Sequence, residues 1–396
     1  MTDDKKELII NQVVAQMFNT SFDDAVQIYL QNFHLLEEVQ FILPHPNGNN
    51  YVEKFQKLDL EGIEVLYFFE SDTLYCLNQK SIMVDLFHVP NLVVKIESCV
   101  SLDTQIQSYL YRKYRKQVHS IPQSIEKIIQ IKNSHLCTMD CFAYAMENSL
   151  FELEYLHDSL FIDNTIAFES YFHKNRFLAR QSANRLLEVY YGMINSGWGD
   201  WWKRQYKLFY LTLLVMADIN INRKHLSLYE KELSLVRYFH EKIGMISDRE
   251  INLAKLFFMH GTNIRFFGKI QKGRKDIIKN LKNMAWDIFH IHFTMNNMTI
   301  QVAPEADFTI PFFVTYDERL KDIIPVYKIR SAAYIKHTTT KYFNYILDII
   351  DPIIKRNYFT SYALSERLNL LKNETEKSLL VKIQKEIDVF ESKFAC

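Results

Sequence analysis

The stretch LVVKIESCVSLDTQIQSYLYRKYRK, residues 92–116, contains the change of pattern that decides the fold. It begins with an apolar run that ends at Leu102, which is typical of a strand, and after Asp103 and Thr104 it continues as a helix. A strand followed directly by a helix indicates an α/β unit, in which the residues between the two elements lie at the carboxyl edge of the sheet. We therefore expect an α/β, helix-rich fold.

Composition supports this expectation and excludes several functions. The chain has 396 residues, of which 48% are hydrophobic, enough for a large core and two or three domains. Gly (9) and Pro (8) are too rare for a many-stranded sandwich or a propeller. Neither GxGxxG nor GxxxxGKS/T occurs, which excludes dinucleotide oxidoreductases and P-loop NTPases. Because Lys+Arg (47) equals Asp+Glu (47), a globally basic protein that coats nucleic acid is excluded, although local patches can bind phosphate.

Cysteine usage and hydropathy predict a reducing, cytoplasmic location and no membrane association. The five cysteines are an odd number, no CxxC pair occurs, and the N-terminus MTDDKKELII is polar. Cys137 and Cys141 would share one face of a helix, either as half of a zinc site or, as we expect, as ordinary half-buried thiols. The longest apolar run, Leu208 to Ala217, is shorter than the ~20 residues that a membrane span needs.

Five parts follow one another along the chain. Helical periodicity up to Phe33 predicts two helices, and short alternating runs between Val39 and Phe87 predict β-hairpins. The segment CTMDCFAYAMENSLF, residues 137–151, and the segment from Glu152 to Lys282 both have helical patterns. We expect a small α+β N-terminal domain (1–90), a first core part (91–150), a helical-bundle insertion (151–280), a second core part (281–345) and C-terminal helices (346–396).

The last predicted helix carries an apolar stripe. Leu380, Ile383, Ile387 and Phe390 recur at helical spacing. This stripe predicts a helix that docks on another surface or dimerises, so that a homo-oligomer is one expected outcome.

Four acids stand at positions that suit metal chemistry. Asp103 and Asp317 each follow an apolar strand, whereas Glu147 and Asp287 lie in helical segments. If the four converge, their oxygens suit Mg²⁺ or Mn²⁺, because close carboxylates repel one another unless a divalent cation lies between them. Such an ion activates water for phosphodiester hydrolysis. Each acid also has a structural alternative, as a helix cap or as a solvated side chain.

Other polar residues are expected to be structural. Asp140 and Asp307 are weaker candidates for metal ligands, and we expect both to be non-catalytic. His290 and His292 alternate with apolar residues, but in the helix that we expect there they diverge by about 200°. We therefore expect packing or surface roles for both histidines.

The residues around the acids resemble the motifs of a known nuclease family. Leu102-Asp103-Thr104 after a strand is similar to the opening Asp-Thr signature of PIN-domain nucleases. Val314-Thr315-Tyr316-Asp317 is similar to their closing Thr-x-Asp signature. Glu147 in AMENSLF and Asp287 in AWDIF stand in the order of the second and third acids. The resemblance covers residues 91–150 and 281–335, and it requires the long helical segment between them to be an insertion.

The resemblance implies a PIN-like, mostly parallel sheet flanked by helices, with an extra N-terminal domain. It also implies a metal-dependent endoribonuclease site at the carboxyl edge of the sheet, using Mg²⁺ or Mn²⁺. The implied catalytic and metal-binding residues are Asp103, Glu147, Asp287 and Asp317. Thr104 and Thr315 would then orient a carboxylate or a metal-bound water.

Two basic stretches lie next to these motifs. The first is YRKYRK, which contains Arg112, Lys113, Arg115 and Lys116. The second runs from Arg265 to Lys282, begins beside two phenylalanines, and contains Lys269, Lys272, Arg274 and Lys275. Basic residues interleaved with aromatic ones suit single-stranded nucleic acid through phosphate contacts and base stacking. The alternative for each stretch is a solvated helix face.

Three functions remain open from the sequence. The leading hypothesis is a metal-dependent endoribonuclease acting on single-stranded RNA as a toxin, growth-arrest or defence effector, with an antitoxin-like regulatory protein as partner. A second hypothesis is a non-enzymatic helical interaction or sensor protein of a two-component defence or toxin system. A third is a DNA-directed nuclease of the same chemistry, because no residue that would recognise a 2′-hydroxyl is identifiable.

Overall fold

The computed structural model describes residues 3–53, 60, 62–85, 87–89, 92–133, 137–141, 144, 146–147, 159–171, 175–193, 199–271, 276–300, 306–336, 338 and 340–395. The described residues form an α/β structure rich in helices, with two four-stranded sheets, as the sequence predicted. The chain divides into two compact units. Unit 1 comprises Met1–Cys141, His292–Tyr316 and Tyr327–Ile346, and unit 2 comprises Phe142–Ile291, Asp317–Val326 and Leu347–Cys396.

A largely parallel sheet forms the centre of unit 1, with the strand order β2-β6-β4-β5. Strand β4 (Ile96–Leu102) pairs in parallel with β5 (Cys137–Asp140) and with β6 (Phe308–Thr315). Strand β2 (Glu64–Tyr67) is antiparallel to β6. Every residue of β6 is buried, as expected for a strand covered on both faces. Helices α6 (Thr104–Tyr114) and α7 (Gln123–Asn133) connect β4 to β5.

Two local predictions for this sheet were wrong. Residues Cys137–Asp140 form strand β5, not the start of a helix, because pairing with β4 outweighs the weak helical pattern of CTMD. Cys137 and Cys141 are nevertheless buried thiols, as expected. In the part of the chain that the structure describes, strand β2 pairs with β6, far along the chain, and forms no hairpin with its neighbours in the sequence.

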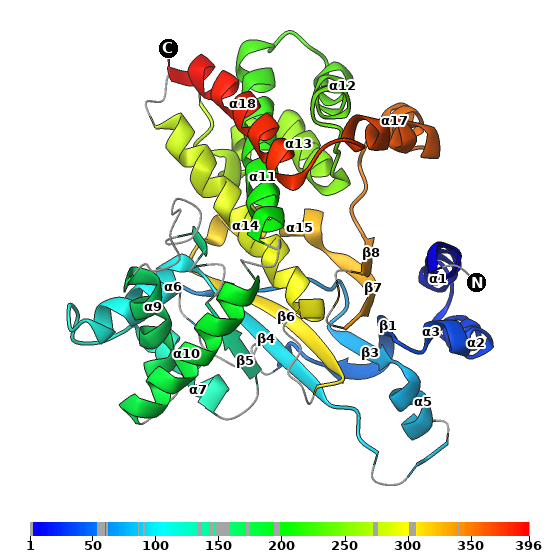
Figure 1. Cartoon of the computed structure of the whole chain (residues 1–396), viewed down its shortest axis with the longest axis vertical. Helices are drawn as coiled ribbons and strands as arrows, with labels where there is room; N and C mark the ends of the chain where they lie inside the picture. Colours follow the sequence, from blue (N-terminus) through cyan, green and yellow to red (C-terminus); the bar gives the residue numbers. More distant parts are fainter. Residues whose placement is uncertain are drawn as a thin grey trace. The chain divides into compact units, whose positions relative to one another are not determined.

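A second, antiparallel sheet in unit 1 has the order β3-β1-β7-β8 (Figure 1). Its strands are β1 (Val39–Asn50), β3 (Thr73–Leu77), β7 (Ile329–Ile335) and β8 (Lys341–Tyr345). Pairing of β1 with β3 is the expected N-terminal hairpin. Because β1 also pairs with β7, however, the predicted N-terminal domain and the predicted second core part share one sheet.

The N-terminal helices pack on this second sheet. They are α1 (Asp3–Phe18), α2 (Phe22–Gln31) and α3 (Phe33–Leu36), and a short helix, α5 (Gln79–Asp85), follows β3. Ser21 caps α2 by accepting a hydrogen bond from the backbone of Asp24. Val14 and Tyr29 from the helices are buried together with Phe41 of β1, so that helices and sheet share one core.

Unit 2 is a bundle of helices. Its longer helices are α9 (Ser159–Ser170), α10 (Arg176–Met193), α11 (Gly199–Asn222), α12 (Leu228–Tyr238), α13 (Asp248–His260), α17 (Ser361–Leu371), α18 (Glu376–Ala395) and the part of α14 (Ile277–Ile300) up to Ile291. Shorter elements are the π-helix η3 (Phe239–Ile243), the 3₁₀ turns η4 (Gly261–Asn263), η5 (Arg265–Phe267) and η6 (Glu318–Asp322), and helices α15 (Ile324–Tyr327) and α16 (Pro352–Tyr358). The described residues of unit 2 are therefore mostly helical.

The apolar stripe of the last helix is buried inside unit 2. Helix α18 lies along α11 (Figure 1), and α11 is buried on all sides around Phe209–Ile219. The buried residues of α18 are Leu379, Ile383, Ile387 and Phe390, so the stripe begins one residue earlier than predicted. This stripe docks within the chain, and it is not an exposed surface for a second copy.

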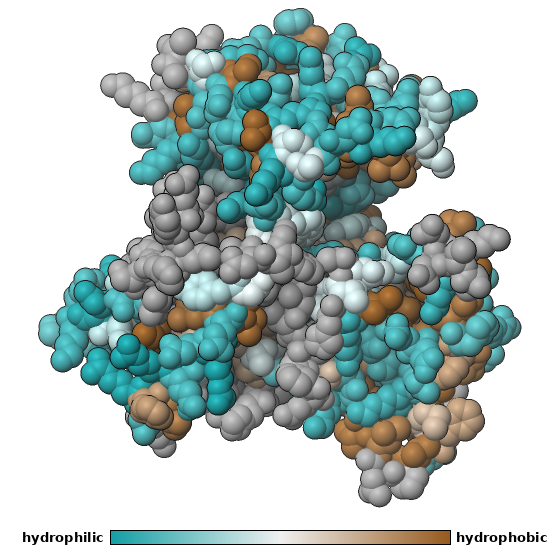
Figure 2. Space-filling model, viewed as in Figure 1, coloured by the Kyte–Doolittle hydropathy of each residue, from teal (hydrophilic) through white to brown (hydrophobic). Residues whose placement is uncertain are grey.

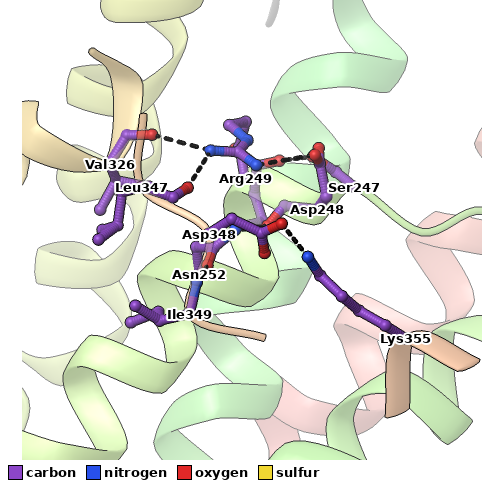
Figure 3. Close-up of polar contacts among 10 residues, drawn as sticks. Ser247, Asp248, Arg249, Asn252, Val326, Leu347, Asp348, Ile349 and Lys355 are labelled. Carbon is purple, nitrogen blue, oxygen red and sulfur yellow. Dashed lines mark hydrogen bonds and ion pairs between the residues drawn. The ribbon is translucent and has the colours of Figure 1, made fainter. Parts of the chain in front are cut away.

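A polar cluster on α13 joins three segments of unit 2 (Figure 3). The Arg249 side chain, 6% exposed, donates hydrogen bonds to the backbone oxygens of Val326 (3.3 Å) and Leu347 (2.7 Å). One turn further along α13, the side-chain oxygen of Asn252 accepts a hydrogen bond from the backbone N–H of Ile349 (2.7 Å). These contacts occupy backbone groups that would otherwise be buried without hydrogen bonds.

The surface follows the usual division of polar and apolar residues. On the face drawn in Figure 2, hydrophilic residues cover most of the described part and hydrophobic residues form scattered patches. Among the described residues, no helix is long and apolar enough to cross a membrane.

Candidate active site

Asp103 lies where strand β4 passes into helix α6. Its backbone adopts the extended conformation of an N-cap residue (φ −64°, ψ 154°), but its carboxylate makes no capping hydrogen bond to the helix. Instead, Oδ2 accepts a hydrogen bond of 2.7 Å from the hydroxyl of Thr315, at the end of β6. Asp103 is 9% exposed and Thr315 is 0% exposed. Asp103 is therefore not a side-chain helix cap, and a buried hydroxyl fixes its orientation.

The sheet topology makes this edge a natural ligand site. Strand β4 lies between β5 and β6. The next strand of this sheet along the chain, β5, adds to one side of β4, and the later strand β6 adds to its other side. In open α/β sheets, the crevice for ligands lies outside the carboxyl ends of the strands at this kind of switch point. Asp103 directly follows β4, Asp140 is the last residue of β5, and Thr315 is the last residue of β6.

Asp140, the last residue of β5, is held in a buried polar network. Its carboxylate, 4% exposed as a residue, accepts hydrogen bonds from the Ser101 hydroxyl (2.6 Å) and the Asn297 side-chain amide (2.9 Å). Burial, with the charge of Asp140 adding to it, raises the pKa of the neighbouring Cys99 thiol. These hydrogen bonds hold the Asp140 carboxylate in place at the end of β5.

A cavity of about 400 Å³ opens beside this edge, within unit 1. Tyr109 of α6 and Tyr316, which follows β6, line it with their rings 6.1 Å apart. The Ser124 hydroxyl lies 3.3 Å from the Tyr316 hydroxyl, and Lys127 lines the same cavity from α7. The Arg112 guanidinium lies 4.6 Å from the centre of the Tyr109 ring. Aromatic rings next to cations suit the stacking of a base and the binding of a phosphate.

Asp317 carries an ion pair in unit 2. It is the N-cap of η6, and its carboxylate accepts hydrogen bonds from the Arg319 backbone (2.9 Å) and Nε (2.7 Å). Burial acts to raise the pKa of Asp317, but the hydrogen bonds and charge of Arg319, with a contribution from Lys269, lower it below its usual value. The predicted structural alternative, a cap, therefore does apply to Asp317.

The other two acids also lie in unit 2. The hydrogen bond and charge of Asp317, with a smaller contribution from the charge of Asp287, raise the pKa of Arg319, so both acids act on one guanidinium. Glu147 lies 3.3 Å from Nε2 of His290. His290 is helical, as predicted, and is buried in α14, but its ring also contacts this acid.

The structure thus distributes the four predicted acids over both units. Asp103 belongs to unit 1, and Glu147, Asp287 and Asp317 belong to unit 2. Among the described residues, no group of three or more His, Cys, Asp or Glu side chains has the arrangement of a metal site. Mg²⁺ usually keeps several waters and needs only one or two protein carboxylates beside substrate phosphates, and Asp103 has the chemistry and the location for such a ligand.

The predicted basic residues have mixed environments. Arg112, Arg115 and Lys116 are exposed on or just after α6, while Lys113 donates a hydrogen bond to the backbone oxygen of His119. In the second stretch, Lys269 is partly buried, and Lys272, Arg274 and Lys275 lie outside the described residues. Both ends of that stretch pair with acids, Arg265 with Asp322 (3.0 Å) and Lys282 with Glu391 (3.0 Å). The first stretch is therefore the stronger candidate for phosphate binding.

Sequence reasoning missed several residues of these sites. Asn297, Ser124 and Tyr316 are single polar or aromatic residues whose neighbours come from distant segments, so no local pattern marks them. Arg319 had a usable signal, because it lies two residues after Asp317 in the segment DER.

Comparisons with known proteins add no family to this geometry. No protein-family model matches the chain, and no match was found among curated proteins or solved structures.

Proposed function

We propose that this protein is a divalent-metal-dependent endoribonuclease that hydrolyses single-stranded RNA, with Asp103 as the carboxylate around which the site is built. The observation that carries the proposal is the geometry of Asp103. This acid stands at the switch point of a parallel sheet, makes no capping bond to α6, and is oriented by Thr315. A carboxylate that a buried hydroxyl holds at the ligand-binding edge of a sheet is suited to bind a cation.

The donor set at this edge is compatible with Mg²⁺ or Mn²⁺. Both ions prefer carboxylate oxygens, and Asp103 supplies a carboxylate that the Thr315 hydroxyl orients. When bound, such an ion lowers the pKa of a water molecule and stabilises charge on the scissile phosphate. The chain itself contributes the orientation of the carboxylate through Thr315. Thr104, the first residue of α6, is proposed to orient a water in the same site.

The cavity beside Asp103 supplies the reason for a single-stranded substrate. Tyr109 and Tyr316 offer ring surfaces on which an unpaired base can stack, and Lys127 and Arg112 offer charges for the phosphates. A base in a duplex is already stacked and does not offer its faces. The same chemistry would act on single-stranded DNA, which the cleavage assay below compares directly.

Glu147, Asp287 and Asp317 are proposed as further acids of the same reaction, on the resemblance to PIN-domain nucleases alone. Asp317 would have to exchange its hydrogen bonds to Arg319 for a metal-bound water, and Glu147 its contact with His290.

The decisive assay is cleavage of end-labelled single-stranded RNA and DNA with Mg²⁺, with Mn²⁺ and with EDTA. Asp103→Asn should reduce the rate at least about 100-fold, because the Lewis-acid effect of a metal contributes several kcal/mol. Asp23→Asn, which changes an exposed acid on α2 of the same unit, is the matched control and should cleave like wild type. Cleavage that resists EDTA, or equal rates for both variants, would refute the proposal.

A second candidate function is a non-enzymatic interaction or sensor protein of a toxin or defence system. It is favoured by the paired state of the unit 2 acids, Asp317 with Arg319 and Glu147 with His290. It predicts no binding of Mg²⁺ or Mn²⁺ by calorimetry and a stable complex with an antitoxin-like or other regulatory protein. Growth arrest on induction that Asp103→Asn relieves would instead support the nuclease as a toxin.

A further inference from the structure

A second cavity, of about 360 Å³, lies within unit 2 and is mostly apolar. Leu208 and Phe209 of α11, Phe239 of η3 and Ile251 of α13 form its inner walls. Leu364 and Leu368 of α17, which are 49% and 57% exposed, also line it and lie toward the solvent. Its volume is in the range of small-molecule sites in proteins, which are typically apolar with a few placed polar groups.

One buried cation lines this cavity. Arg367 of α17 is 8% exposed, and its Nη1 donates a hydrogen bond of 2.6 Å to the backbone oxygen of Tyr358. Burial lowers the pKa of this guanidinium. Within the described part of the chain, no carboxylate forms an ion pair with it, and the neighbouring acid Glu366 instead contacts His240 (3.5 Å). A guanidinium has five N–H donors, and a buried charge is costly unless a partner compensates it.

The other charged group of the cavity wall has a hydrogen-bond donor of its own. Glu250 is 4% exposed and lines the same cavity. Its carboxylate accepts a hydrogen bond from the Ser247 hydroxyl, and it lies in the first turn of α13, where the helix favours negative charge. The cavity therefore combines apolar walls with an uncompensated positive charge at Arg367.

We propose that this cavity binds an aliphatic carboxylate, with the hydrocarbon chain between α11 and α17 and the carboxylate on the Arg367 guanidinium. A carboxylate accepts two parallel N–H bonds from a guanidinium, which matches the donors that Tyr358 leaves. Gly244 keeps the wall close on the side of α17: at its φ of 82°, an added Cβ would lie 3.2 Å from Leu371. The proposal is independent of nuclease activity, because it rests on residues of unit 2 alone.

Calorimetry with octanoate and 1-octanol tests the charge and the chain separately. Wild type should bind octanoate about 10- to 100-fold more tightly than 1-octanol, since a hydrogen bond to a charged group contributes about 1.5–3 kcal/mol. Arg367→Met should lower octanoate affinity to the level of 1-octanol. Arg356→Met, at an exposed position of α16, is the matched control and should bind like wild type.

A second variant keeps the test decisive if Arg367→Met does not fold. Leu364→Glu adds a carboxylate at a half-exposed position of the cavity wall, one helical turn from Arg367, so it should fold and should abolish octanoate binding by pairing with Arg367. Circular dichroism would verify folding of each variant. Absence of octanoate binding by wild type, equal affinity for octanoate and 1-octanol, or full octanoate binding by Leu364→Glu would each overturn the proposal.

Discussion

Replacement of Thr315 by valine tests how the candidate site is held together. Valine has nearly the shape of threonine, so Thr315→Val removes the hydroxyl and leaves the packing of β6 unchanged. The lost interaction is the 2.7 Å hydrogen bond to Oδ2 of Asp103, between two buried residues. A hydrogen bond to a charged group contributes about 1.5–3 kcal/mol, and the carboxylate that remains has lost a donor.

This free energy predicts a measurable change in thermal unfolding. For a unit of this size, 1 kcal/mol shifts Tm by ~2–4 °C, so Thr315→Val should lower Tm by about 3–12 °C. It should also lower the metal-dependent cleavage rate by about 10- to 100-fold, the usual effect of removing a group that orients a metal ligand.

Strand β6 itself provides the matched control. Thr309 is also 0% exposed, but its hydroxyl has no hydrogen-bond partner among the described residues. Thr309→Val should therefore leave Tm unchanged or raise it, because a buried hydroxyl without a partner is destabilising. Equal Tm changes in the two variants would refute the role of the Thr315 hydroxyl. Destabilisation of Thr315→Val without loss of cleavage would show that the Thr315 hydroxyl supports the fold and is not needed to orient Asp103 for the reaction.

Three further predictions concern other parts of the molecule. Arg319→Met should raise the lowered pKa of Asp317. A carboxyl group whose pKa is lower in the folded than in the unfolded state stabilises the fold at pH values above its unfolded pKa, and this stabilisation is lost as the pH falls through its folded pKa. The difference in Tm between Arg319→Met and wild type should therefore be present at pH 7 and vanish in acid. A Tm difference that does not depend on pH would contradict this. Arg249→Met removes the side chain that donates hydrogen bonds to two backbone oxygens, and it should lower the free energy of unfolding in urea by about 2–5 kcal/mol. The control Arg237→Met, at an exposed position of α12, should change this free energy little. Tyr109→Leu should weaken binding of single-stranded oligonucleotides about 5- to 100-fold in fluorescence anisotropy, because stacking contributes ~1–3 kcal/mol per base; unchanged affinity would exclude the cavity as a base site.

Local patterns in the sequence were sufficient for many elements of the fold. The apolar run before Asp103 and the run before Asp317 predicted β4 and β6, and helical periodicity predicted α14 and the helices of unit 2. These predictions succeed because strand and helix periodicity are set by residues that are near neighbours in the chain. The weak pattern of Cys137–Asp140 failed for the same reason, since only pairing with β4 makes that segment a strand.

Partners that are distant in the chain were decided by the tertiary structure alone. The sequence by itself determined that acids follow strands and that Thr315 precedes Asp317 by two residues. It did not determine that Thr315 binds Asp103 across 212 positions or that Asn297 binds Asp140. Hydrogen bonds and charges act over a few ångströms in space, and which side chains come that close depends on strand order and helix packing, which no local pattern contains.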